Sequence, residues 1–137
     1  MMANADTITA WITFFFGLYA FAAGLGELRQ PGFWADMLSD VKRSRALQFL
    51  TGMITLVLGA TIFLVNPFNP TDWLSILITV LGVWIFLEGV LIFAFGDWFL
   101  NFAGKMMGSG LRIWAILSLV LGILIIFVAL WRLQVAT

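Results

Sequence analysis

The stretch WLSILITVLGVWIFLEGVLIFAF, residues 73–95, decides the fold because it is a long apolar run with one charged residue, Glu88. A bilayer hydrocarbon core of about 30 Å is crossed by about 20 consecutive apolar residues in a helix. No water reaches the backbone there, so every N–H and C=O must be bonded within the segment, which favours an α-helix. We therefore predict that this stretch crosses a membrane as one helix.

Three further runs match it in length and character: residues 8–28, 46–66 and 111–133. The chain of 137 residues is 63% hydrophobic and 10% charged, whereas soluble domains carry about 25% charged residues. No lysine or arginine precedes the first run, so we expect it to be retained and not removed as a signal peptide. The sequence predicts an all-α membrane protein with four transmembrane helices in a single domain, residues 1–137.

The first and third links between these runs are long and amphipathic. In residues 31–44 and 97–107, apolar and aromatic side chains recur every three or four positions, with charged residues between them. This pattern is typical of a helix that lies in the membrane interface. The second link, NPFNPTD at residues 66–72, has the Pro and Asn content of a tight turn. We expect two interfacial helices and one turn.

Basic residues lie mostly on one side of the four runs. Arg132 alone lies on the other side; the residues that flank the first and third links are Arg29, Lys42, Arg43, Arg45, Lys105 and Arg112. By the positive-inside rule, links 29–45 and 96–110 face the cytoplasm, and both termini lie outside.

Small residues spaced seven apart occur in each run, and the pairs of the first half recur in the second at a constant offset. The matches are Gly17/Gly24 with Gly82/Gly89, and Gly52/Gly59 with Ala115/Gly122. We expect two tandem helix–interfacial helix–helix repeats, parallel in topology, over about residues 8–66 and 73–133. Seven residues are close to two helical turns, so both small residues share one face and let a neighbouring backbone approach. We interpret them as helix-packing residues.

Glu88 requires neutralisation, because a charge near the bilayer centre costs roughly 2.5–3.5 kcal/mol on insertion scales. The first repeat has Ala23 and Phe49 where the second has Glu88 and Arg112. Because both charges are peculiar to the second repeat, we predict a Glu88–Arg112 ion pair. The alternative is that Glu88 carries a proton or binds a cation in a transporter. Glu27 is expected to be a solvated interfacial residue.

Several function classes have no support in the sequence. Cysteine and histidine are absent, which removes disulfides, thiolate and imidazole metal ligands, and two common catalytic side chains. The serines have no histidine base, the carboxylates do not cluster at metal-ligand spacing, and no dinucleotide or P-loop motif occurs. A net charge of zero gives no basic patch for nucleic acid. We expect no catalytic residues, no metal, no cofactor, no nucleic-acid partner and no enzyme activity.

The second half resembles the YjeT-like family of small, uncharacterised bacterial inner-membrane proteins. The features that carry the resemblance are LEG at residues 87–89, an aromatic amphipathic link, and Leu111-Arg112 followed by a helix that contains Gly122. The N-terminal half looks like a diverged duplicate. Members of the family are typically one two-span unit of unknown activity, so the resemblance implies a bacterial inner membrane and little chemistry.

Together these observations predict a non-enzymatic, multi-pass inner-membrane protein. Its partners would be the lipid bilayer and either other membrane proteins or copies of itself, as an accessory or scaffold subunit or a self-associating bundle. The alternative is a small channel or transporter for protons, cations or other small solutes that uses Glu88. A third possibility is lipid binding by the two aromatic interfacial helices.

Overall fold

The computed structural model describes residues 5–108 and 110–136, and helices account for nearly all of them. They are α1 (Ala5–Arg29), α2 (Phe33–Arg43), α3 (Arg45–Val65), α4 (Trp73–Met107) and α5 (Leu111–Ala136). No strand occurs in these ranges. Four of the helices, α1, α3, α4 and α5, are long and apolar enough to cross a membrane. The predicted all-α fold with four membrane-length helices is confirmed.

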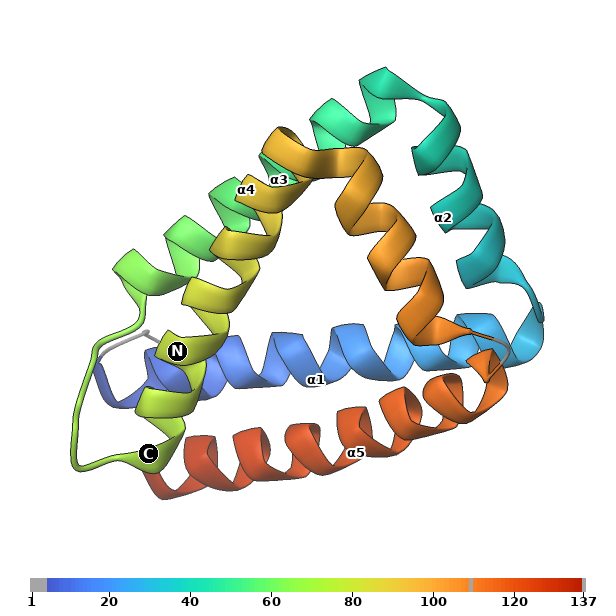
Figure 1. Cartoon of the computed structure of the whole chain (residues 1–137). Helices are drawn as coiled ribbons and strands as arrows, with labels where there is room; N and C mark the ends of the chain where they lie inside the picture. The colour runs from blue at the N-terminus through green and yellow to red at the C-terminus, as the bar shows by residue number, and fades with distance from the viewer. Residues whose placement is uncertain (1–4, 109, 137) are drawn as a thin grey trace.

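Helix α4 combines the third predicted span with the third link. Its backbone departs from helical geometry at Phe95 (φ −137°, ψ 49°), and the helix resumes after this kink. The part beyond Phe95 turns away from the first part and runs beside α2, which occupies the first link (Figure 1). The predicted end of the third span, residue 95, thus coincides with the bend, although the chain continues as one helix.

The helices form three arms of a triangle (Figure 1). One arm is α1 packed on α5, the second is α3 packed on the first part of α4, and the third is α2 beside the last part of α4. The start of α1, the end of α5 and the loop between α3 and α4 lie at the same corner. Only 17–28% of the residues in the apolar windows of the four long helices are buried. The fold is therefore two helix pairs, not a four-helix bundle with a common core.

Short polar side chains begin α3 and α4. The Ser44 hydroxyl accepts a hydrogen bond from the Leu47 amide, and the Asp72 carboxylate accepts one from the Leu74 amide. These bonds satisfy backbone donors that have no partner inside the first helical turn.

Glu27 fulfils the same role for α2, and the expectation that it is solvated is wrong. Its side chain is 4% exposed. One carboxylate oxygen accepts the Gly32 amide and the other accepts the Trp34 amide, both at 2.8 Å. A carboxylate beside free amides at a helix N-terminus is favoured by hydrogen bonding and by the helix dipole. Glu27 therefore fixes the turn between α1 and α2.

Candidate functional site

The α1–α5 pair is built on small residues that bring the two backbones close together. A Cβ added to Gly17 would lie 2.8 Å from the Ile126 side chain, and one added to Gly24 would lie 2.6 Å from the Ala115 carbonyl oxygen. Ala115 itself is fully buried. The Ser118 hydroxyl donates a 2.7 Å hydrogen bond to the Ala20 carbonyl across the same contact. Close backbone approach and an interhelical hydrogen bond are what hold helices together in lipid.

The α3–α4 pair repeats this arrangement. A Cβ added to Gly59 would overlap the Phe86 backbone, and one added to Gly89 would overlap the Leu56 backbone. Contacts in the two pairs join residues at equivalent positions of the two halves. The equivalent contacts are Gly24–Leu119 with Gly89–Leu56, and Gly122–Phe21 with Gly59–Phe86. Each pair therefore joins one helix of the N-terminal half to one helix of the C-terminal half.

A polar cluster joins the two pairs at the corner where α1 starts and α5 ends. The Thr9 hydroxyl lies 2.6 Å from the Asn66 carbonyl oxygen Oδ1, to which it donates. The Asn66 amide donates to the Ser75 carbonyl and to the Thr79 hydroxyl. Thr9, Asn66 and Ser75 are buried, so the bonds are shielded from solvent. The cluster ties the start of α1 to the loop before α4.

A second tie at this corner is the ion pair between Asp72 and Arg132. Two guanidinium nitrogens of Arg132 donate to the two carboxylate oxygens of Asp72, at 3.0 and 2.9 Å. The guanidinium also lies 5.4 Å from the ring centre of Trp73. These hydrogen bonds hold the pKa of Asp72 below its ordinary value of 3.8, although partial burial opposes the shift. The pair links the start of α4 to the end of α5.

The predicted ion pair between Glu88 and Arg112 is absent from the structure. The ion pairs of the described residues are Arg43–Asp40 and Asp72–Arg132. The physical reason is the helix pairing: α4 packs on α3, whereas α5, which carries Arg112, packs on α1. Arg112 is exposed and Glu88 is half-buried. Glu88 thus has no cationic partner in the described part of the chain.

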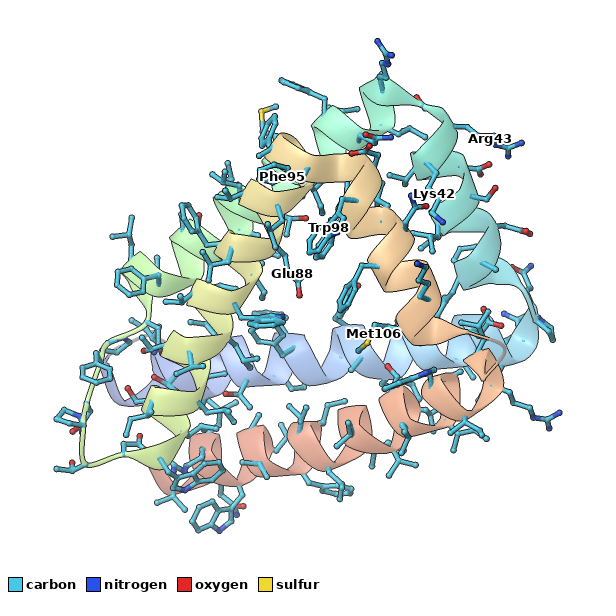
Figure 2. The ribbon with its side chains drawn as sticks, viewed as in Figure 1. Lys42, Arg43, Glu88, Phe95, Trp98 and Met106 are labelled. Atoms are coloured by element: carbon cyan, nitrogen blue, oxygen red, sulfur yellow. The ribbon has the colours of Figure 1, made fainter. Side chains whose placement is uncertain are left out.

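Glu88 points into the region enclosed by the three arms, as do Trp98 and Met106 (Figure 2). The Trp84 side chain, one turn earlier on α4, lies near the Glu88 carboxyl. Trp84 and Trp98 are 61% and 59% exposed, and the Trp98 ring stacks on Phe102 with 5.8 Å between ring centres. The Glu88 carboxylate and the partly exposed Trp98 ring therefore face the same region.

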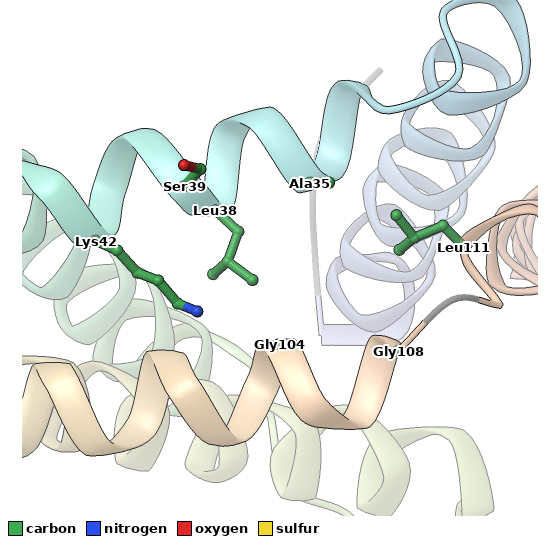
Figure 3. A pocket seen from close by; sticks show the side chains of 7 residues that line it. All are labelled: Ala35, Leu38, Ser39, Lys42, Gly104, Gly108 and Leu111. Carbon is green, nitrogen blue, oxygen red and sulfur yellow. The ribbon is translucent and has the colours of Figure 1, made fainter.

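A groove of about 160 Å³ lies between α2 and the last part of α4 (Figure 3). Leu38 and Lys42 of α2 face Gly104 of α4 and Gly108, the residue after that helix, across it. Gly104 leaves room for the lysine, because a Cβ there would lie 3.2 Å from the Lys42 ammonium nitrogen. The groove is a packing feature between the two shorter helical segments.

Sequence reasoning missed the Asp72–Arg132 pair, although a signal for it exists. Arg132 is the one basic residue on its side of the predicted spans, and Asp72 lies in the turn on that side. Two opposite charges at the same membrane boundary are candidates for pairing. No comparable signal separates the buried Glu27 from an ordinary interfacial acid.

Comparisons with known proteins give no match: no family model fits the chain, and no curated protein or solved structure is significantly similar to it. The chain is therefore identified as a membrane protein by its four helices that are long and apolar enough to cross a membrane.

Proposed function

We propose that this multi-pass membrane protein binds a small cationic solute or a proton at Glu88 and carries it across the bilayer. One observation carries the proposal: Glu88, within a membrane-length helix, meets no basic residue of the described chain and points between the two helix pairs. An acid in such a position is expensive in lipid and acquires a partner. Its partner then comes from outside the chain.

Because Glu88 does not pair with Arg112, a role for Glu88 in transport is favoured over a purely structural role. An ion pair with Arg112 would have given Glu88 a structural role in helix packing. Without it, Glu88 is a half-buried intramembrane carboxylate with no ion-pair partner among the described residues, and such groups are typical of ion and substrate pathways.

The test is flux through the purified protein in liposomes. Wild type and Glu88→Gln are compared for proton and potassium flux under an imposed gradient, with Asp97→Asn as the matched control. Asp97 is an exposed acid on the same helix beyond the kink, so its loss changes net charge equally. We expect Glu88→Gln to abolish the flux of the wild type and Asp97→Asn to retain it. Equal flux in wild type and Glu88→Gln would reject the proposal.

A second candidate is an accessory or scaffold subunit of a membrane complex, or a self-associating bundle. It is favoured by the absence of a common core, because the two helix pairs leave wide apolar faces for a partner helix to cover. Cross-linking in native membranes followed by affinity purification tests it. A stoichiometric protein partner, or a discrete oligomer, would support this candidate, and recovery of the monomer alone would count against it.

We further propose a tandem duplication and a bacterial inner-membrane location, with links 29–45 and 96–110 cytoplasmic and both termini outside. The equivalent glycine contacts of the two helix pairs support the duplication. The start of α1, the end of α5 and the α3–α4 loop lie at one corner, with the basic links away from it, which supports an even number of crossings. Membership of the YjeT-like family remains a prediction.

A further inference from the structure

We infer that Glu88 and the exposed rings around it form a binding site for an aromatic or alkylated organic cation. The inference rests on the proposed function and names the class of solute. Three features argue for it: the charge of the site, the shortage of oxygen ligands, and the aromatic surface beside the carboxylate.

The charge of the site calls for a cation. The ion pairs of the described residues are Arg132–Asp72 and Arg43–Asp40, and neither of them includes Glu88. The Trp84 indole, which lies near the carboxyl, is uncharged and does not cancel a full charge. A bound cation would do so.

The neighbourhood is poorly suited to a bare metal ion. Calcium takes six to eight oxygen ligands, and magnesium requires an octahedral set. The described residues contain no group of three or more side chains of the kinds that hold a metal. The groups next to Glu88 on its helix are mainly apolar and aromatic, for example Trp84, Leu87 and Leu91. A cation that keeps its own apolar substituents loses little hydration on entering such a site.

Aromatic faces supply the remaining attraction. A ring attracts a cation that lies over its face, and tryptophan does so best. Trp84 precedes Glu88 at the helical spacing of one turn, and Trp98 points into the same enclosed region from beyond the kink. The bend at Phe95 turns the last part of α4, which carries Trp98, into the third arm of the triangle. A flat or bulky organic cation would meet the carboxylate and the rings together.

The first experiment measures binding of tetraphenylphosphonium to the full chain in lipid nanodiscs by equilibrium dialysis. We expect saturable binding that Glu88→Gln weakens at least about tenfold, because the charge partner is lost. Trp84→Leu should weaken it about three- to tenfold. Asp97→Asn and Trp114→Leu, which change an exposed acid and an exposed indole at other places, should stay within about twofold.

A neutral probe of similar shape, triphenylphosphine oxide, separates charge recognition from simple partitioning. It should not displace tetraphenylphosphonium. Binding to Glu88→Gln within about twofold of wild type, or displacement by the neutral probe at equal concentration, would overturn the inference.

The two proposals fail in distinguishable ways. Flux that depends on Glu88 without tetraphenylphosphonium binding would reject the organic-cation site and would still support transport of protons or inorganic cations. Glu88-dependent binding without any flux would support the site and reject transport.

Discussion

Gly59→Ala tests the close approach of α3 and α4 most sharply. The added methyl group would overlap the backbone nitrogen and Cα of Phe86, and a backbone cannot rotate away as a side chain does. Relief requires the two helices to separate along their contact. Inserting a methyl group into a tightly packed interface typically costs about 1–3 kcal/mol. Alanine also favours helix over glycine by about 1 kcal/mol, which partly offsets that cost.

Gly26→Ala is the matched control because nothing lies within 4 Å of a Cβ at that position of α1. It gains the same helix propensity without the overlap. The free energy of unfolding of Gly59→Ala should therefore be about 1–3 kcal/mol below that of Gly26→Ala. Gly52→Ala should fall between them, since a Cβ there would lie 3.2 Å from the Ile92 side chain and 3.3 Å from the Phe93 backbone nitrogen, which is tight contact but not overlap.

The assay is reversible unfolding in mixed detergent micelles, titrated with sodium dodecyl sulfate and followed by tryptophan fluorescence. If Gly59→Ala and Gly26→Ala unfold at the same detergent fraction, the glycine contact does not limit the approach of the two helices, and the packing argument fails.

Three further predictions concern the polar ties and the topology. Removing the ion pair with Asp72→Asn should lower the free energy of unfolding by about 1–3 kcal/mol near neutral pH. Because Arg132 lowers the pKa of Asp72 below 3.8, this difference in stability should vanish as the pH falls through that lowered pKa. A difference in stability that persists in acid would contradict the prediction. Glu27→Ala should cost about 0.5–2 kcal/mol and speed hydrogen exchange at the first amides of α2, whereas unchanged protection of those amides would show that the carboxylate does not cap the helix. In this cysteine-free chain, an impermeant maleimide added outside intact cells should label Phe68→Cys and spare Ser39→Cys; the reverse pattern would invert the proposed orientation.

Much of the architecture could be predicted from local patterns. In lipid, a long apolar segment satisfies its backbone hydrogen bonds by forming a helix, so the four spans can be predicted from hydropathy alone. The seven-residue spacing of Gly52 and Gly59 indicates a helix face with room for a neighbouring backbone, and the structure places the α4 backbone against both glycines. The kink at Phe95 coincides with the point where the apolar run of the third span gives way to the amphipathic link.

The choice of partner for each helix could not be predicted in the same way. Glycines on one helix face indicate that another backbone packs closely there, but they do not indicate which helix supplies that backbone. From the sequence, α5 could pack on α4 as well as on α1. The expected Glu88–Arg112 pair depended on that choice, and it is absent because the actual pairing separates the two helices. Glu27 is a similar case: its burial depends on the turn of the chain around it, which hydropathy does not encode.

Disulfide cross-linking in native membranes tests the helix pairing directly, because the chain has no cysteine of its own. A disulfide requires Cα atoms less than about 7 Å apart, and the 2.7 Å hydrogen bond from Ser118 to the Ala20 carbonyl brings those two backbones together. We predict that Ala20→Cys/Ser118→Cys forms a disulfide efficiently and that Glu88→Cys/Arg112→Cys does not. Cross-linking of the Glu88/Arg112 pair without cross-linking of the Ala20/Ser118 pair would place α5 on α4 and contradict the account.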